Sequence, residues 1–359
     1  MNIIHYIDSL SVGGAQSLMY ELHDAIKNNY PGYKQYICAP PNAPINKDFK
    51  LTWNVKINLQ EFINIPNVFI KKNKLNKCIV IVHKVLKTDT RKFNSIYSKI
   101  PIIMINHTLP GSTTCRGKVD AIVSVSKHMY KKISALNTGA RNEFIRNGVG
   151  YKKYESILAR ENIYGNKYLL TGRINRIAGI KYSPRWLSWC SFVKLKKRMV
   201  HEYIGRGESY KKAVDLVKKF QKVGAKKIIN KVVIMGSIDN FEKKISVLKS
   251  WDLFLYSVMH NEGTSMSILE SLACGVPVVC SAHYGNMELI SNGVNGYIFK
   301  NYLEATSILN KLSGNPERLK ELKKTTKRHF IRNLDSSIMA GEYIKLIESV
   351  YSSREAKSV

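Results

Sequence analysis

Short apolar runs alternate with amphipathic segments along most of the chain. Residues 3–7, 78–83 and 102–106 have the length and the β-branched content of buried strands. Residues 15–27 and 210–222 repeat their apolar positions at helical spacing. Strands that are apolar throughout and are separated by helices are typical of parallel βαβ units. The pattern therefore predicts an α/β protein.

The same pattern extends through the rest of the chain. It predicts further strands at residues 36–39, 121–125, 144–146, 168–171, 199–204, 231–235, 251–256 and 276–280. It predicts further helices at residues 127–136 (capped by Ser126), 241–248, 266–272 and 286–290, and two or three helices over 304–352. The segment 182–192, which contains Trp186 and Trp189, receives no assignment.

A domain boundary is expected near the middle of the chain. Asn147-Gly148 is a strong turn signal, and residues 151–166 are polar and without regular period. A chain of 359 residues is also too long for one ordinary core. We therefore expect two tandem doubly wound, Rossmann-like domains at 1–150 and 151–330. The helices of residues 331–359 are expected to pack back toward the first domain.

Several classes of protein are disfavoured by composition. No run approaches the ~20 apolar residues of a membrane span, and the first residues lack the features of a signal peptide. The six cysteines form no Cys-x-x-Cys pair and the nine histidines are scattered, so we expect reduced thiols and no metal site. These features predict a cytoplasmic protein that holds no cofactor.

The charge is strongly basic, with 57 Lys and Arg against 26 Asp and Glu. Between Lys47 and Lys153 the excess is greatest, with 21 basic residues against five acids. Self-repulsion of this size destabilises a compact chain unless a polyanion relieves it. The charge therefore indicates nucleic acid or an anionic membrane as a partner, although a generally basic proteome would also produce it.

The candidate chemistry begins in the first domain. Gly13 and Gly14 lie between the first strand and the first helix, where a ligand can approach the backbone and a helix N-terminus favours an anion. His107 follows the strand 102–106, at the edge where open α/β sheets contact ligands. His83 ends another strand in the same way and competes with His107.

The most informative segment is 260–280. It places Glu262 in a loop and Glu270 inside a short helix, with Gly263, Thr264, Ser265 and Met266 at the join. Because eight residues of helix span ~12 Å, the two carboxylates are not expected to act as one acid–base pair. Separate contacts fit better: Glu262 with sugar hydroxyls, Glu270 with ribose hydroxyls, and the amides of Ser265 and Met266 with phosphate.

Cations for a diphosphate follow the first strand of the second domain. Arg173 stands in Leu-Leu-Thr-Gly-Arg, and Arg176, Lys181 and Arg185 come after it. A diphosphate leaving group needs such cations where no metal is held, since negative charge builds on it as the glycosidic bond breaks.

In this order the pieces resemble the retaining, nucleotide-sugar-dependent glycosyltransferases of family four, which have the GT-B fold. The likeness is specific from Glu262 to Tyr297, through Glu-Gly-x6-Glu-x3-Cys-Gly-x-Pro-Val-Val and Asn-Gly-x-Asn-Gly-Tyr. It implies two Rossmann-like domains facing across a cleft, with the acceptor on the first and the donor on the second. It also implies a metal-independent, retaining sugar transferase that uses a nucleotide-diphosphate sugar such as a UDP-sugar.

The resemblance assigns roles to individual residues. It implies that Gly14 meets the donor phosphate, His107 the sugar and Arg173 the diphosphate. It adds Gly205, from a strand-and-glycine segment, and Ser237, from a segment that contacts the base. The family usually places a Lys five or six residues after the Arg, but Ala178 and Gly179 stand there. Lys181 is the nearest replacement and Arg176 is a second.

Three hypotheses for the acceptor side stay open. In the first, favoured by the basic first half, the acceptor is a modified base in DNA, as in bacteriophage genomes. In the second, the acceptor is a lipid-linked glycan or polysaccharide at an anionic membrane, where the basic helix 127–136 would dock peripherally. In the third, the chain is a non-catalytic nucleic-acid-binding protein.

Overall fold

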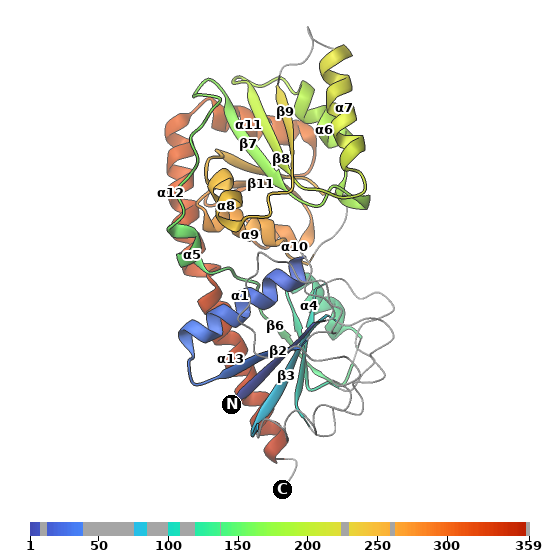
Figure 1. Cartoon of the computed structure of the whole chain (residues 1–359), viewed down its shortest axis with the longest axis vertical. Coiled ribbons are helices and arrows are strands. Elements are labelled where there is room, and N and C mark those ends of the chain that lie inside the picture. The colour runs from blue at the N-terminus through green and yellow to red at the C-terminus, as the bar shows by residue number, and fades with distance from the viewer. Residues whose placement is uncertain are drawn as a thin grey trace. The chain divides into compact units, whose positions relative to one another are not determined.

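The computed structural model describes residues 1–7, 13–38, 75–84, 100–107, 119–136, 138–223, 230–258 and 263–356 (Figure 1). The chain divides into two compact units. The first comprises Met1–Gly150 together with Leu334–Val359, and the second comprises Tyr151–Asn333. The C-terminal residues from Leu334 onward therefore return to the first unit.

The first unit contains a six-stranded sheet in the order β2-β1-β3-β4-β5-β6, and all of its neighbouring strands are parallel. Its strands are β1 (Asn2–Ile7), β2 (Lys34–Cys38), β3 (Cys78–Lys84), β4 (Ile102–Asn106), β5 (Ala121–Ser124) and β6 (Arg141–Phe144). Its described helices are α1 (Gly14–Asn29), α4 (Lys127–Ser134) and α13 (Ser336–Ala356). The chain starts at β1, adds β2 as the edge strand on one side, and then adds β3, β4, β5 and β6 in turn on the other side.

The core of this unit lies on the apolar strands. Ile4 pairs with Tyr36 on one side and with Val80 on the other, and Ile4 and Val80 are buried in one cluster. The last helix is attached by charge: the Arg354 Nε donates to Asp120 Oδ1 at 2.7 Å, and Asp120 Oδ2 accepts from the Ile102 amide at 2.8 Å. Helix α13 is thereby linked to the start of β4.

The second unit contains another six-stranded parallel sheet, in the order β12-β11-β10-β7-β8-β9. Its strands are β7 (Leu169–Ile174), β8 (Met199–Ile204), β9 (Lys231–Gly236), β10 (Leu253–Tyr256), β11 (Val278–Ser281) and β12 (Gly296–Phe299). Its helices are α5 (Tyr151–Glu155), α6 (Pro184–Phe192), α7 (Tyr210–Val223), α8 (Phe241–Lys249), α9 (Met266–Ala273), α10 (Tyr284–Met287), α11 (Tyr302–Ser313) and α12 (Pro316–Asn333). A single turn of 3-10 helix covers Gly179–Lys181.

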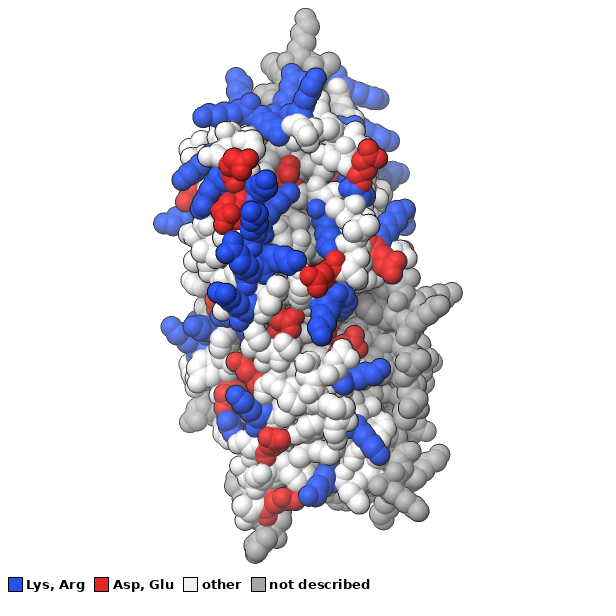
Figure 2. All heavy atoms as spheres, turned by 90° about the vertical axis from the view of Figure 1, so that its left-hand side faces the viewer, with Lys and Arg blue, Asp and Glu red and all other residues white. Residues whose placement is uncertain are grey.

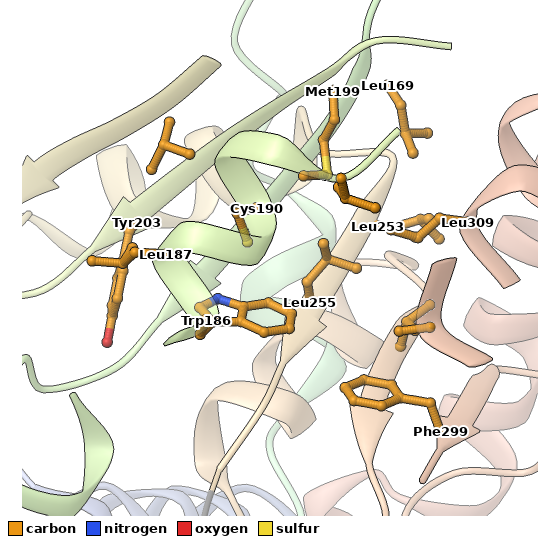
Figure 3. Packing of buried hydrophobic residues seen from close by; sticks show 14 of the residues in the cluster. Leu169, Trp186, Leu187, Cys190, Met199, Tyr203, Leu253, Leu255, Phe299 and Leu309 are labelled. Atoms are coloured by element: carbon orange, nitrogen blue, oxygen red, sulfur yellow. The ribbon is translucent and has the colours of Figure 1, made fainter. Parts of the chain in front are cut away.

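Trp186 lies at the centre of the second core, where α6 packs over the sheet (Figure 3). Its ring is parallel to that of Phe299, with 6.5 Å between the ring centroids, and its centroid lies 4.9 Å from that of the Trp189 ring. Leu187 and Cys190 from the same helix are fully buried beside it. A buried aromatic side chain of this size contributes much of the apolar area removed from water, so α6 is part of the core.

The structure confirms two doubly wound parallel sheets, and it corrects several local expectations. The segment 182–192, left without assignment, forms α6, with Ser183 capping it through a bond from the Trp186 amide and Pro184 in its first turn. The strand expected at 144–146 ends at Phe144 and begins at Arg141. A short helix, α5, opens the stretch expected to be irregular. Local patterns fail here because these segments are short and are stabilised by tertiary packing.

Two more elements differ near the C-terminal end of the second sheet. The helix expected at 286–290 is the shorter α10 at Tyr284–Met287. Strand β12, Gly296–Phe299, was not expected, because four residues are too few to show a strand pattern. The tail forms three helices, within the expected number.

Candidate functional site

The carboxyl ends of the strands in the second unit share one edge, because all six strands are parallel. The strand order reverses between β7 and β10, where the first strand of this unit meets the fourth. Ligands of open α/β sheets bind at such a switch point, outside the carboxyl ends of the strands. Most of the residues expected to contact the donor come from this edge.

Arg173 lies on β7 at the switch point and is fully buried. Its guanidinium carbon lies 5.2 Å from the ring centres of Tyr203 and Tyr256 and 6.0 Å from that of Trp186. Among the described residues its Nε and Nη1 atoms have no hydrogen-bond partner and no carboxylate pairs with it. A buried cation in this state is costly unless an anion joins it.

Lys181, expected to complete the diphosphate clamp, is adjacent to this arginine. The Arg173 Nη2 donates to the main-chain oxygen of Lys181 at 3.3 Å. Lys181 ends the short 3-10 turn and is half-buried. The alternative cation, Arg176, is exposed. The contact between Arg173 and Lys181 is therefore made by the main chain of Lys181. The loop that joins the two residues is longer than the usual family spacing, as the sequence suggested.

A buried histidine beside Arg173 escaped the sequence analysis. His201 faces Thr171 across the sheet, with 3.0 Å between the His201 Nδ1 and the Thr171 Oγ1, and the Thr171 hydroxyl also donates to the Val200 carbonyl oxygen at 3.1 Å. Burial first, and then the charge of Arg173, lowers the pKa of His201 to about 3. The ring is therefore neutral, and Nδ1 carries its proton. His201 stands next to Glu202 in Met-Val-His-Glu-Tyr-Ile, so neither a period of two nor a motif marked it as a buried residue.

The start of α9 supplies main-chain amides. Ser265 is the N-cap, its side chain makes no capping bond, and its hydroxyl lies 3.0 Å from that of Ser267. The first amides of a helix lack partners within the helix and favour an anion. Gly263, Thr264 and Met266 lie beside this N-terminus, as expected. Glu262 lies outside the described residues.

Glu270 is held by a lysine that the sequence did not single out. Lys244, on α8, places its Nζ 3.0 and 3.1 Å from the two carboxylate oxygens of Glu270. The two side chains are 21% and 12% exposed. A carboxylate in this pair is fixed in orientation and still has lone pairs for other donors. The pairing could not be read from the chain because the two residues are 26 positions apart on different helices.

The two remaining donor-site positions, Gly205 and Ser237, follow β8 and β9 at the same edge. A Cβ on Gly205 would lie 1.9 Å from the main-chain oxygen of Asn175, so glycine is required for the close approach of two strand ends. Ser237 follows Gly236, whose φ of +76° favours glycine. The sequence did not single out Arg206, which lies next to Gly236. Its Nε is 3.5 Å from the position that a Cβ on Gly236 would occupy. It is exposed and adds a cation to this edge.

In the first unit, Gly13 is the N-cap of α1 and Gly14 is its first residue. A Cβ on Gly13 would lie 2.5 Å from the Gln16 Oε1. The absence of a side chain at Gly13 therefore leaves room for the side chain of Gln16. His107 directly follows β4 and is half-buried. His83 is buried on the neighbouring strand β3, where burial first, and then the charges of His5 and His107, lower its pKa well below its ordinary value.

His83 belongs to a buried chain of hydrogen-bonded side chains, of which the sequence indicated only His83 itself. The His5 Nδ1 lies 3.0 Å from the His83 Nε2, and the His5 Nε2 lies 2.9 Å from the Gln35 Oε1. Because Gln35 donates its amide to the main-chain oxygen of His23, its Oε1 faces His5 and accepts. His5 therefore carries its proton on Nε2, and His83 donates from Nε2. Burial lowers the pKa of His5 to about 3, so both rings are neutral.

No helix in the described ranges combines the length and the apolar character that a bilayer crossing demands. Across those same ranges, no three His, Cys, Asp or Glu residues are grouped so as to hold a metal ion.

The basic excess is distributed differently from what the local count suggested. The second unit carries 33 Lys and Arg against 14 Asp and Glu, and the first carries 24 against 12. Much of the basic stretch 47–153 lies outside the described residues. The larger charge imbalance therefore belongs to the unit that holds the candidate donor site.

Comparison with known proteins points to the same unit. Residues 204–329 match the family described as glycosyl transferases group 1. The chain is 24% identical over 334 residues to an uncharacterised glycosyltransferase of Methanocaldococcus jannaschii, covering 80% of this chain and 82% of that protein. It is 32% identical over 102 residues to the poly(glycerol-phosphate) alpha-glucosyltransferase of Bacillus subtilis, covering 28% of this chain and 14% of that one.

The fold is also similar to that of solved structures. The Anabaena protein HepE in complex with UDP and glucose superposes with a TM-score of 0.71 at 14% identity, covering 97% of this chain and all of that one. These matches show the GT-B fold, built from two Rossmann-like halves, and they support a glycosyltransferase whose group 1 region lies in the second unit.

Proposed function

We propose that the protein transfers a sugar from a UDP-sugar to a hydroxyl group of a polyanionic acceptor, without a metal and with retention of anomeric configuration. The observation that carries this proposal is Arg173, a buried cation without an acidic partner among the described residues, at the switch point of the unit that matches group 1 glycosyltransferases. A diphosphate is the anion that suits it. The complex of HepE with UDP and glucose supports UDP as the nucleotide.

Each residue of the edge has a role in this reaction. The bond between the anomeric carbon and the diphosphate oxygen breaks, and its electron pair goes to the diphosphate. Arg173, with Lys181 and the first amides of α9, stabilises the charge that develops there. The acceptor oxygen forms the new bond to the anomeric carbon, and its proton passes to the departing diphosphate oxygen. Such stabilisation replaces the role that a metal ion has in other transferases.

The two carboxylates orient the donor. Glu270, fixed by Lys244, accepts hydrogen bonds from ribose hydroxyls, and Glu262 contacts hydroxyls of the transferred sugar. Gly205 and Ser237 contact the nucleoside, and the roles assigned to Gly14 and His107 are contacts with the donor phosphate and the sugar. Holding the sugar and the leaving group in a fixed geometry lowers the entropic part of the barrier.

For the acceptor we propose a phosphodiester polymer. The net charge of +31 supports a polyanion. The name of the Bacillus subtilis relative identifies poly(glycerol phosphate) as the acceptor of that protein. DNA, the acceptor favoured from the sequence, is a phosphodiester polymer of the same charge class. These two polymers are therefore the first substrates to compare.

A lipid-linked acceptor at an anionic membrane is a second candidate, and one surface favours it. Helix α4 exposes Tyr130 and, just past its end, Leu136, at 37% and 51%, next to the exposed Lys131 and Lys132. Basic residues interleaved with apolar ones suit an anionic bilayer surface.

The test is product analysis. The protein is incubated with UDP-glucose, UDP-galactose and UDP-N-acetylglucosamine, each with duplex DNA, poly(glycerol phosphate) or phosphatidylglycerol vesicles that contain polyprenyl phosphate. Mass spectrometry then locates the added sugar on nucleosides, polymer repeats or lipid. Sugar on either polymer supports the proposal, and sugar on the lipid alone replaces the acceptor class. A protein that binds DNA but consumes no donor would be the non-catalytic nucleic-acid-binding protein.

A further inference from the structure

One end of the second unit is densely basic. Figure 2 shows Lys and Arg gathered over the upper end of this unit. We name these residues the amino-edge surface, because they surround the amino ends of the strands. They are Lys167, Lys194, Lys196, Lys197, Arg198, Lys218, Lys219, Lys222, Lys231 and Lys311.

Backbone contacts bring these residues together from distant parts of the chain. The Leu169 amide donates to the Arg198 carbonyl oxygen at 2.8 Å, and Val200 pairs with Lys231, so the starts of β7, β8 and β9 are adjacent. The Lys196 amide donates to the Asn310 Oδ1 at 2.7 Å, which adds the end of α11.

The end of α7 joins the same surface. The rings of Phe192 and Phe220 meet edge to face at 5.2 Å, which places the last turn of α7 beside the loop that follows α6. Side chains of this surface are exposed except that of Lys197, which is half-buried.

The cations of this surface differ from others in the same unit in their charged neighbours. Within the described ranges no carboxylate forms an ion pair with any residue of the amino-edge surface. Elsewhere in the unit, Lys323 pairs with Asp252 at 3.1 Å, and Arg328 pairs with Glu321 at 3.3 Å. Repulsion among the lysines of the amino-edge surface is therefore left for an external polyanion to relieve.

The amino-edge surface is opposite the donor edge of the same sheet. Strand β8 has six residues, and at ~3.3 Å per residue the two edges lie about 20 Å apart. A phosphate bound at the amino-edge surface therefore does not belong to the reacting unit of the acceptor. It belongs to a distant part of a long chain.

We infer that the amino-edge surface holds the phosphodiester acceptor polymer at a point remote from its reacting hydroxyl. This inference rests on the proposed function. Two attachment points on one chain raise the effective concentration of the second, so long polymers bind more tightly than short ones. The surface is dominated by lysines, which act on phosphate as hydrated point charges and do not select sequence.

A polymer fits this surface better than a bilayer. Insertion into a membrane requires apolar side chains among the cations. Leu195, the apolar residue within the loop from Lys194 to Arg198, packs against the core of the unit. Phe192 and Phe220 pack against each other.

The test compares two variants of equal charge. The edge variant carries Lys194→Gln, Lys196→Gln, Lys222→Gln and Lys231→Gln. The control variant carries Lys243→Gln, Lys300→Gln, Lys324→Gln and Arg332→Gln, four exposed cations of the same unit outside the amino-edge surface. Affinity for poly(glycerol phosphate) and for a 30-base-pair DNA duplex is measured over a salt series.

We expect the edge variant to bind one or both polymers on the order of tenfold more weakly near 100 mM salt, with a shallower salt slope. We expect the control variant to stay close to wild type. Equal binding by both variants contradicts the inference. A second result also contradicts the inference: wild type and the control variant bind phosphatidylglycerol vesicles but neither polymer, and the edge variant does not bind the vesicles.

Kinetics separate this inference from the proposed function. In the edge variant we expect KM for long polymer to rise while kcat, hydrolysis of the donor and transfer to a one-repeat acceptor stay unchanged. If neither wild type nor variant consumes donor, the proposed function fails. If the edge variant transfers sugar normally and its KM for long polymer equals that of wild type, only the role inferred for the amino-edge surface is refuted.

Discussion

Lys244 and Glu270 form a two-point ion pair, with the lysine Nζ 3.0 and 3.1 Å from the two carboxylate oxygens. Lys244 acts as a positioning residue because it orients the carboxylate that we assign to the ribose. We expect Lys244→Met to raise KM for the UDP-sugar by about tenfold, the value of one charge-assisted hydrogen bond, with little change in kcat. Steady-state kinetics on the purified variant measure both constants.

The neighbouring residue provides the control for this pair. Lys243 is exposed on the same helix, so Lys243→Met removes the same charge without touching Glu270. An equal rise in KM for both variants would mean that net charge, and not the orientation of Glu270, determines donor affinity.

Substitution of Arg173 is predicted to lower transfer activity without lowering thermal stability. Because the described residues provide its guanidinium with no acidic partner, Arg173→Met is expected to leave Tm unchanged or higher, as replacing buried charges by apolar side chains often does. Transfer activity should fall by ~100-fold or more, since the developing charge on the diphosphate loses its nearest cation. Thermal unfolding and initial rates of the same preparation give both values.

Arg176→Met is the matched change at an exposed arginine three residues further on. We expect its rate to remain within about twofold of wild type, as for most surface substitutions. Should Arg173→Met unfold the protein, the arginine would be a structural residue and its assignment to the diphosphate would be wrong.

The strands and the fold were readable from the sequence because parallel strands buried on both faces are apolar throughout. Ser126 was also readable as a cap, and its hydroxyl accepts from the Met129 amide at 3.2 Å. Lys244 and His201 were not, since each acquires its partner from another element through packing. The placement of Glu262 and the contacts of His107 with a sugar stay predictions.

Three buried histidines, His5, His83 and His201, predict a loss of stability in acid, because burial lowers the pKa of each in the folded protein. Burial lowers the pKa of His5 and of His201 from 6.5 to about 3 in the folded protein. Between these values the unfolded chain binds protons that the folded chain does not, so the free energy of unfolding falls as pH decreases below 6.5. Each histidine contributes up to ~1.4 kcal/mol per pH unit. Urea unfolding at pH 7.5, 6.0 and 5.0 measures the slope.

His201→Asn tests the origin of this slope, because an amide can still donate to Thr171 without titrating. We expect the variant to lose up to ~1.4 kcal/mol per pH unit of the dependence below pH 6.5. An unchanged slope would show that His201 is not the group responsible.

Gly205 is predicted to be required for folding of the donor edge. A Cβ there would lie 1.9 Å from the Asn175 main-chain oxygen, so Gly205→Ala should cost about 1–3 kcal/mol, as overpacking does. Gly32→Ala, where a Cβ meets nothing within 4 Å, should be nearly neutral. Urea unfolding of the two variants compares them, and equal stability would exclude a packing role for Gly205.

The central claim is that the carboxyl edge of the second sheet binds a UDP-sugar and breaks its bond to the diphosphate. The most direct measurement is the release of UDP from UDP-sugars by wild type, Glu262→Ala and Arg173→Met, with and without polymer acceptor. We predict release by wild type that polymer accelerates, and a loss of ~100-fold or more in both variants. Full UDP release by both variants, or none by wild type with any donor, would contradict the claim.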